Sequence, residues 1–439
     1  MSSETSERHA AAAPTGPTAG ARMTSRERLR LVLVLGFLTA SGPLTVDLYL
    51  PALPAITAEL ITTAASVQLT LTGMLAGLAL GQLFVGPLAD AIGRRTPLLA
   101  GIALHVVASV LCVVAPNIAI LGVLRVLQGL GCAAATVVAM AIVRDLFTGP
   151  AAARVLSRLM LVMGAAPILA PTVGGLVLGV TSWRGVFTLL AAYGVAILLV
   201  TARLLPETLP VTARRGGGVR GTVRDYGRLL TDRGYVGLIL VAGLSLSANF
   251  AYIAGSSFVF QEQYGLTEQQ FGLVFGAGAI GLVGATQVNV RLLRRFTPTQ
   301  ILTGAVAGGA IAGLLVLLFA TTGFGGLPAL VVALWLVLAA TGLAVPNAPA
   351  LALSRHGEAA GTAAALLGAV QFGIGAIAAP LVGVLGAGVV AMALVITGAL
   401  LAANAVLLLV LRPWQLPAPP AATAAHRPSS RRTDREERP

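Results

Sequence analysis

The stretch GPLADAIGRRTP, residues 86–97, is a short polar break between two long apolar segments. A second break of this kind, QVNVRLLRRFTP at residues 287–298, lies in the second half of the chain, and each contains an arginine pair shortly before Thr-Pro. Each break also follows the second apolar segment of its half. This faint repeat is typical of a membrane protein built from two related six-helix units.

The apolar segments around these breaks have the length of membrane spans. The chain is 56% hydrophobic and 10% charged with a mean hydropathy of +0.89, whereas a soluble domain is roughly 25% charged. A helix needs about 20 apolar residues to cross the hydrocarbon of a bilayer. We therefore predict an all-α membrane protein with twelve transmembrane helices in two six-helix bundles. The predicted spans are 30–57, 67–88, 97–115, 118–143, 155–180, 185–205, 235–258, 268–290, 299–321, 327–349, 360–384 and 388–411.

The positions of the arginines predict the orientation. All 29 basic residues are arginine and the formal net charge is +13, a balance that by itself would point to nucleic acid. If the N-terminus is cytoplasmic, however, the outside loops hold only Arg184. This asymmetry follows the positive-inside rule, so we expect both termini in the cytoplasm and no nucleic-acid partner. The first apolar stretch exceeds a signal-peptide core of about 7 to 15 residues, so no cleavable signal is expected.

Polar segments mark the expected domain boundaries. We predict disordered cytoplasmic tails at 1–29 and 412–439, because neither has the apolar content to form a core. The six-helix bundles are expected at 30–206 and 235–411, with a cytoplasmic linker at 207–234. Cys112 and Cys132 fall inside predicted spans, where packing is expected rather than a disulfide.

Several motifs carry a resemblance to a known family. The loop at 86–95 is similar to the signature G-x-L-x-D-x-x-G-R-R, and RVLQGLG at 125–131 is similar to the fourth-helix motif R-x-x-Q-G. GAAPILAPTVGG at 164–175 is similar to the fifth-helix motif of antiporters. On these residues the chain from about 30 to 411 resembles the major facilitator superfamily.

A narrower resemblance is to the drug:proton antiporters of the bicyclomycin-resistance (Bcr/CflA) type. It rests on DLYLPALP at 47–54, VRDL at 143–146, PNA at 346–348 and AGTAAALLGAVQF at 360–372. The resemblance implies proton-coupled efflux of small amphipathic compounds such as antibiotics, by alternating access, across a bacterial cytoplasmic membrane. A dedicated exporter of one endogenous metabolite or antibiotic is the alternative. The loop at 287–298 lacks the Asp and Gly of the signature, so a gate role is carried over only to the first loop.

Two residues of opposite charge are predicted deep in the spans: Asp47 and Arg125. A charge at the bilayer centre costs at least about 2.5 to 3.5 kcal/mol, so we interpret the two as a proton site and its counter-ion. Arg125 is expected to pair with Asp47 and to hold it ionised until substrate or a conformational change weakens the pair. A permanent ion pair that only locks two helices is the alternative. His105 is a second candidate proton carrier, although a lone histidine on an apolar helix more often serves packing.

The first loop is the predicted gate, with Gly86, Asp90, Gly93, Arg94 and Arg95. Membrane anchoring explains both arginines but not Asp90. Its carboxylate can meet a neighbouring arginine such as Arg144, or a helix N-terminus near Glu358, as a cytoplasmic latch. Small residues and prolines of span five let helices pack closely and bend, which suits a hinge. These are Gly164, Pro167, Pro171, Gly174 and Gly175.

Uncharged polar and aromatic residues within the spans are the candidates for lining a substrate cavity, each with interhelical hydrogen bonding as the alternative. They are Tyr49, Gln128, Asn249, Tyr252, Asn347 and Gln371. As a set they suit small amphipathic ligands. The expected partners are therefore such a ligand, protons and the lipid bilayer, for a monomer without cofactor or metal.

Other functional classes fit the sequence less well. A membrane-embedded transferase would need an acidic metal-binding cluster or a nucleophile with its base at the lipid boundary, and no such cluster is seen. A nucleotide-driven pump needs a phosphate loop with Gly-Lys-Ser or Gly-Lys-Thr, and this chain has no lysine. A channel or a receptor stays open as an alternative.

Overall fold

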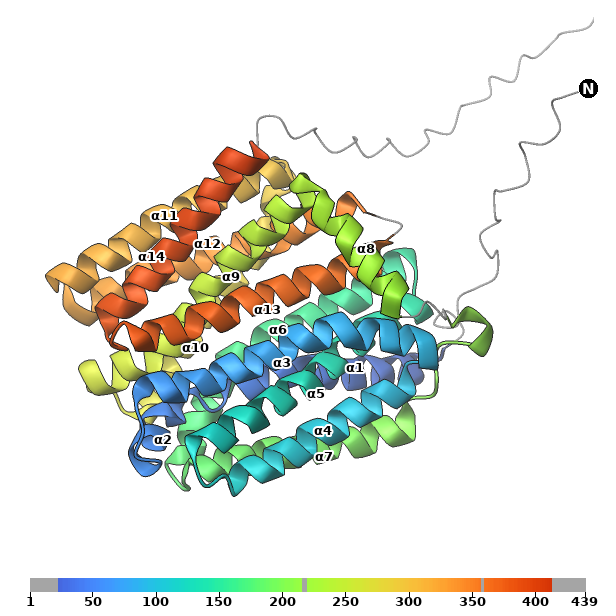
Figure 1. Ribbon diagram of the computed structural model, residues 1–439, viewed down its shortest axis with the longest axis horizontal. Coiled ribbons are helices and arrows are strands. Elements are labelled where there is room, and N and C mark those ends of the chain that lie inside the picture. The colour runs from blue at the N-terminus through green and yellow to red at the C-terminus, as the bar shows by residue number, and fades with distance from the viewer. Residues whose placement is uncertain (1–22, 215–218, 357–358, 413–439) are drawn as a thin grey trace, which may run out of the picture.

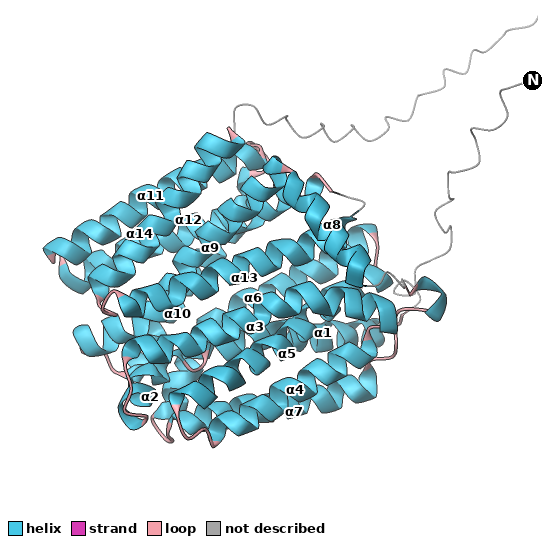
Figure 2. Ribbon diagram, in the orientation of Figure 1, coloured by secondary structure: helices cyan, strands magenta, loops and turns pink. Residues whose placement is uncertain are grey.

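A computed structural model describes residues 23–214, 219–356 and 359–412. Most of both predicted tails, part of the predicted linker and Glu358 lie outside these ranges. Within them all regular secondary structure is helical (Figure 2). In the described part of the chain, twelve helical segments are long and apolar enough to cross a membrane, the first of them running from Ser25 to Glu59. The twelve predicted spans are thereby confirmed.

The helices fall into two groups separated by a polar segment. The first group is α1 (Ser25–Asp47), η2 (Leu50–Ala52), α2 (Leu53–Glu59), α3 (Ala64–Ile92), α4 (Arg95–Val113), α5 (Ile118–Leu146), α6 (Gly149–Leu178) and α7 (Trp183–Leu204). The polar segment contains η3 (Val211–Ala213) and α8 (Val219–Thr231). The second group is α9 (Arg233–Ser257), η4 (Phe258–Gln263), α10 (Glu268–Leu292), α11 (Pro298–Thr322), α12 (Gly326–Ser354), α13 (Ala360–Val384), α14 (Val389–Ala405) and η6 (Val406–Leu411).

Side-chain caps set where many of these helices begin. Thr24, Thr267 and Thr297 each accept a backbone N–H three residues later, and a Glu or Gln at that third position bonds back to the threonine N–H. Such capping boxes satisfy backbone donors that a helix leaves free at its first turn. The capping boxes therefore stabilise the first turns of α1, α10 and α11.

The two groups pack side by side, with α3 against α13 and α6 against α10 (Figure 1). Glycines allow the second contact. A Cβ at Gly175 would lie 2.7 Å from the Glu268 carbonyl oxygen, and one at Gly272 would lie 2.8 Å from that of Pro171. Because a real Cβ does not approach so closely, the α6–α10 spacing depends on these positions having no side chain.

The two ends of the bundle differ. We call the end that carries Ser25, Arg94, Arg144, Leu204 and α8 the basic end. Most hydrogen bonds between the two groups lie at the opposite end, and in each a side chain of one group donates to a backbone carbonyl of the other. The five bonds are Gln68 Nε2 to Ala254 at 3.0 Å, Ser257 Oγ to Leu50 at 2.7 Å, Gln261 Nε2 to Pro51 at 3.2 Å, Gln269 Nε2 to Gly175 at 3.3 Å and Thr172 Oγ1 to Gly272 at 3.2 Å.

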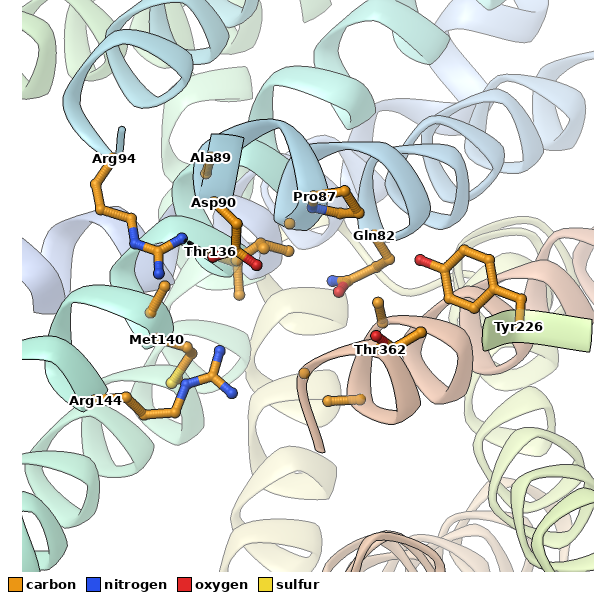
Figure 3. A pocket seen from close by; sticks show the side chains of 16 residues that line it. Gln82, Pro87, Ala89, Asp90, Arg94, Thr136, Met140, Arg144, Tyr226 and Thr362 are labelled. Atoms are coloured by element: carbon orange, nitrogen blue, oxygen red, sulfur yellow. Dashed lines mark hydrogen bonds and ion pairs between the residues drawn. The ribbon is translucent and has the colours of Figure 1, made fainter. Parts of the chain in front are cut away.

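At the basic end a cavity of about 190 Å³ separates the groups. Figure 3 shows Asp90, Arg94 and Arg144 on one side of it and Tyr226 and Thr362 on the other. Here the linker helix α8 supplies a contact, because the Tyr226 hydroxyl donates to the Leu83 carbonyl at 3.0 Å. The bundle is thus sealed at the opposite end and parted at the basic end.

Candidate functional site

Asp47 is the last residue of α1, at a break in the first span. The predicted apolar span at 30–57 is confirmed as one membrane span, Ser25–Glu59. Its helix is interrupted, however, because a turn and η2 separate α1 from α2. Pro51 and Pro54 explain the break, since proline cannot donate in the interior of a helix. The Asp47 side chain is buried, and its Oδ1 has no hydrogen-bond partner among the described residues. The break therefore presents an unpartnered carboxyl inside the bundle.

Arg125 on α5 does not pair with Asp47 in the described state, which contradicts the alternative of a permanent ion pair. Both Nη atoms of Arg125 donate instead to the Thr45 carbonyl, each at 3.1 Å, and Nη1 also donates to Gln128 Oε1 at 2.9 Å. The α-helix ends two residues beyond Thr45, so a carbonyl of its last turn is free to accept. The partner of the Arg125 guanidinium is therefore the Thr45 carbonyl at the end of α1, and not the Asp47 carboxyl.

Aromatic rings and a polar chain complete the surroundings of Arg125. Its guanidinium carbon lies 4.1 Å from the Tyr49 ring centroid and 5.8 Å from that of Phe187, distances typical of cation–π contacts. Behind it, Gln128 Nε2 donates to Ser109 Oγ at 2.7 Å, and this hydroxyl donates to the His105 carbonyl at 2.7 Å. The buried charge is held without a neighbouring anion among the described residues.

A cavity of about 110 Å³ lies beside Asp47, between the two groups of helices. Its wall includes Met163 and Pro167 of α6 together with Asn249 and Tyr252 of α9. Tyr252 stacks on Phe275 of α10, with ring centroids 5.1 Å apart and planes inclined by 15°. One carboxyl, one amide and one phenol thus face a mostly apolar space, as a site for a small amphipathic ligand requires.

The other predicted cavity residues lie elsewhere. Tyr49 and Gln128 are fully buried around Arg125. Asn347 Nδ2 donates to Asn289 Oδ1 at 2.7 Å, a bond that joins α12 to α10. Gln371 is not among the residues that line the cavity at Asp47. Of the six predicted residues only Asn249 and Tyr252 line this cavity.

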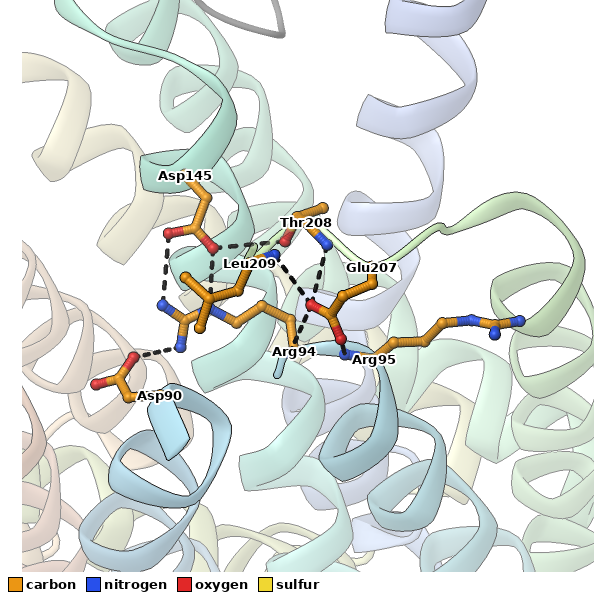
Figure 4. Close-up of polar contacts among 7 residues, drawn as sticks. All are labelled: Asp90, Arg94, Arg95, Asp145, Glu207, Thr208 and Leu209. Carbon is orange, nitrogen blue, oxygen red and sulfur yellow. Dashed lines mark hydrogen bonds and ion pairs between the residues drawn. The ribbon is translucent and has the colours of Figure 1, made fainter. Parts of the chain in front are cut away.

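A cluster of charges joins four segments at the basic end (Figure 4). Arg94 pairs with Asp90 of α3, and its Nε donates to Asp145 Oδ2 of α5 at 2.9 Å. Glu207, beyond the end of α7, accepts the backbone N–H of Arg94 at 2.8 Å and that of Arg95 at 3.2 Å. We call Asp90, Arg94, Asp145 and Glu207 the basic-end clamp. The partner of Asp90 is therefore Arg94 and not Arg144, which faces the cavity at this end.

Gly93 lies at the turn beside the clamp, where the backbone conformation requires a glycine. Its φ of +104° is one that residues with a side chain rarely adopt, and a Cβ there would overlap the Glu207 carboxylate. Burial alone would raise the pKa of Glu207, but hydrogen bonds from the backbone amides of Leu209, Arg94, Arg95 and Thr208 outweigh burial and lower it. The carboxylate is thus held ionised at the turn that Gly93 forms.

Comparison with known proteins establishes the family. The Major Facilitator Superfamily model matches residues 33–380. The chain belongs to this superfamily. It is 38% identical over 356 residues to YdgK, an MFS-type transporter of Bacillus subtilis, with 81% of this chain and 88% of that protein covered. It is 30% identical over 346 residues to a bicyclomycin resistance protein homolog of Haemophilus influenzae, with 79% and 87% covered.

A solved structure agrees with the fold. A D-xylose-proton symporter superposes with a TM-score of 0.66 at 15% identity, over 85% of this chain and 96% of that one. The predicted all-α major facilitator fold with two six-helix bundles is confirmed, as is the resemblance to the bicyclomycin-resistance type. The chain is accordingly a multi-pass membrane transporter of this superfamily.

The small residues of α6 that the sequence predicts as a hinge pack closely against neighbouring helices. A Cβ at Gly174 would overlap the Leu48 carbonyl oxygen, and one at Gly164 would lie 3.1 Å from a Val283 methyl. Pro171 contributes its carbonyl to the contact with Gly272. Gly86 lines the cavity at the basic end, and Arg95 Nη2 donates to the Ala202 carbonyl at 2.7 Å. Gly86, Gly164, Pro171 and Gly175 thus border the second bundle, whereas Gly174 and Arg95 make contacts within the first.

Sequence reasoning missed several residues of these sites. The role of the Thr45 carbonyl as acceptor for Arg125 has a signal in the sequence, because Pro51 predicts that the helix ends shortly before residue 51 and leaves carbonyls of its last turn free. The sequence shows Asp145 as a carboxylate beside Arg144, but it does not indicate that Asp145 pairs with Arg94. Glu207 gives no signal in the sequence, because it acts on backbone amides more than a hundred residues away. Phe275 of α10 lines the cavity, where its ring stacks on that of Tyr252.

Proposed function

We propose that this transporter exports small amphipathic compounds, such as antibiotics, in exchange for protons. The observation that carries the proposal is Asp47: a buried, unpartnered carboxyl at a helix break, facing a cavity between the two bundles. A carboxyl is the simplest group that can take up and release one proton there. The relative that bears the name bicyclomycin resistance protein homolog supports the choice of substrate class.

The proton step uses Asp47 and Arg125. An isolated carboxylate in an apolar site is costly, so the neutral acid fits the described state, in which Arg125 is bound to the Thr45 carbonyl and Gln128. When Asp47 loses its proton, its carboxylate becomes a stronger acceptor for Arg125 than a neutral carbonyl. We propose that Arg125 then moves from the Thr45 carbonyl to Asp47, which changes how α1 packs on α5.

Alternating access follows from the two ends of the bundle. In the predicted orientation the basic end and both termini are cytoplasmic, so the cavity between the bundles at the basic end lies on the cytoplasmic side. On closing, the Asp90 carboxylate, whose side chain is 48% exposed, can approach the positive end of the α13 helix dipole across the cavity. We propose that this contact is the cytoplasmic latch. The chain acts as a monomer in a bacterial cytoplasmic membrane, with substrate and protons as its only transported ligands.

A growth-inhibition panel in an efflux-deficient bacterial host tests the proposal. The wild-type chain should raise the inhibitory concentration of several chemically unrelated amphipathic antibiotics, and Asp47→Asn, expressed to the same level, should not. Protection against a single compound would instead favour the dedicated exporter. No protection by the wild-type chain against any compound, despite normal membrane insertion, would count against drug efflux.

A further inference from the structure

Helix α8, in the polar segment that joins the two bundles, contacts both of them. Its Tyr226 hydroxyl donates to the Leu83 carbonyl of α3, and the same side chain lines the cavity at the basic end. Three residues later Leu229 is buried in an apolar cluster with residues of α9 that include Tyr235 and Leu238. Figure 1 shows α8 running across the spans rather than along them. Tyr226 and Leu229 thus fix where α8 lies on the bundles.

This position is at the boundary of the membrane. Leu83, the acceptor for Tyr226, lies five residues before the end of the apolar segment predicted at 67–88, or about 7.5 Å along α3. Beyond it Phe84 and Leu88 are 61% and 47% exposed, so the outer surface of α3 stays apolar toward the basic end. Exposed apolar surface of this kind marks contact with lipid in a membrane protein. Helix α8 therefore lies beside the end of the hydrocarbon region.

The side chains of α8 divide into three faces. With 3.6 residues per turn, Val223 and Leu230 lie about 20° apart around the helix, and both are exposed, at 60% and 54%. The face that contacts the bundles lies about 80° to one side of this apolar pair. Arg224 and Arg228, both exposed, lie about 130° to its other side. A helix that lies in a membrane interface has this arrangement, with its apolar side chains toward the acyl chains and its basic ones toward the headgroups.

The charge of α8 favours anionic headgroups. Among the described residues, no hydrogen bond or ion pair engages the side chain of Arg224 or Arg228. Asp225 is also exposed and pairs with neither. By sequence α8 carries Arg220, Arg224 and Arg228 against this one aspartate, a net charge of +2. A cluster of basic residues beside a membrane boundary attracts anionic lipids.

The neighbouring carboxylates do not compensate these arginines. Asp232, between α8 and α9, accepts from Arg355 Nε at 3.2 Å. Asp90 lines the same cavity as Tyr226, but it pairs with Arg94. Both acidic groups already have a basic partner, so the arginines of α8 are free to bind a ligand of opposite charge.

We propose that α8 is an interfacial helix that binds anionic phospholipid headgroups of the leaflet at the basic end. Val223 and Leu230 enter the boundary of the acyl chains. Arg224 and Arg228 bind the phosphates. Because its third face contacts α3 and α9, the lipid-bound helix holds both bundles at one level of the leaflet. This surface lies outside the cavity at Asp47 and does not depend on the proposed export reaction.

Nitroxide labels on single cysteines of the full chain test the location of α8. The variants are Val223→Cys and, as a matched control, Gly221→Cys, which lies about 160° away on the same helix and where a Cβ meets nothing within 4 Å. Wild type, whose Cys112 and Cys132 are buried, reports background labelling. In phosphatidylglycerol vesicles the label at Val223 should be more accessible to oxygen, which concentrates among acyl chains, than to a water-soluble nickel chelate. The label at Gly221 should show the reverse.

A change of lipid charge tests the arginines. The spectrum of the Val223 label separates immersed from detached helix, and the ratio of the two should be higher in phosphatidylglycerol than in phosphatidylcholine. Arg224→Gln with Arg228→Gln should lower the ratio in phosphatidylglycerol by about fivefold for each arginine removed, and should abolish the difference between the two lipids. Arg294→Gln with Arg295→Gln, which removes an exposed arginine pair between α10 and α11, should keep the wild-type difference.

Three results would overturn the proposal. The first is a Val223 label that is more accessible to nickel than to oxygen in phosphatidylglycerol. The second is a Val223 label that is shielded from both reagents in vesicles that contain only this protein, because a second copy of the chain would then cover the apolar face. The third is an equal response to lipid charge in the two double variants, because the arginines of α8 would then have no specific role.

Discussion

At the scale of single residues, Asp47 and Arg125 belong to adjacent but separate sites. The arginine is satisfied by a carbonyl, an amide and two aromatic rings, while the carboxyl faces a cavity without a partner. Each group can therefore change its state without first breaking a bond to the other. The protonation of Asp47 and the position of the Arg125 guanidinium are therefore two separate variables.

Substitution of Arg125 tests this division. Arg125→Ala should lower both expression and transport, because the Thr45 carbonyl and the Gln128 oxygen lose their donor, at about 1 to 3 kcal/mol for each buried group left unpaired. Arg125→Lys should restore folding better than transport, because lysine keeps the charge but not the planar fork. Size-exclusion chromatography reports folding and efflux assays report transport. Near-wild-type transport by both variants would remove Arg125 from the mechanism.

The sequence predicts the important residues better than it predicts their partners. Asp47 and Arg125 are identified because charge is rare within apolar spans. The sequence does not predict that the two side chains are separated, because this depends on the exact place where α1 ends. It also depends on the rings of Tyr49, in the turn after α1, and Phe187 of α7. In the same way Asp90 is identified by its loop, but the choice of Arg94 over Arg144 depends on the turn at Gly93.

At the scale of helices, the interrupted first span and the glycine-bearing face of α6 fit together. The carbonyl of Leu48, just beyond the end of α1, lies against Gly174 of α6. This contact positions the break that presents Asp47 to the cavity. The extents of the spans follow from hydropathy and caps, but this break follows from two prolines and a contact with another helix.

Gly174→Ala should disturb the break. A Cβ there would overlap a backbone oxygen, and such overpacking costs about 1 to 3 kcal/mol. We expect a lower thermal midpoint and slower transport. Gly281→Ala on α10 is the matched control, because a Cβ at Gly281 meets nothing within 4 Å. Equal thermal midpoints and equal transport for the two variants would show that the α6 contact does not position the site.

The proposed latch gives a prediction about Asp90. Asp90→Asn should shift the transporter toward the state that is open at the basic end, because a neutral amide interacts weakly with the positive end of α13. Substrate binding should be retained. Single cysteines at Thr362, which lines the basic-end cavity, and at Ala64, at the opposite end of α3, report the change by their labelling rates. An unchanged ratio of the two rates would leave Asp90 with only its role in the clamp.

At the scale of the whole molecule, two bundles meet on a surface that is closed at one end. Glycine contacts and hydrogen bonds between the bundles seal the end opposite the basic end. The basic end is held together within the first bundle by the clamp but is parted from the second by a cavity. Rocking of one bundle against the other would exchange the two ends.

The number of charges moved predicts the driving force. With Asp47 as the sole carrier, one proton enters for each substrate expelled, so export of a neutral compound moves one net charge and export of a monocation moves none. A potential of 100 mV acting on one charge is worth about 2.3 kcal/mol, or roughly fortyfold in gradient. Collapse of the potential with potassium and valinomycin should therefore slow export of neutral compounds and spare monocations. Potential-driven export of monocations would require a second proton site, and His105 is the first residue to test.

The most direct test of proton coupling through Asp47 uses proteoliposomes that contain only this protein and a neutral compound exported in cells. Wild type should move the compound against its gradient when a pH difference is imposed. It should also exchange labelled for unlabelled compound when no pH difference is present. We predict that Asp47→Asn keeps this exchange and loses the uphill movement. Uphill, pH-driven movement by Asp47→Asn at the wild-type rate would contradict the assignment of Asp47 as the proton carrier.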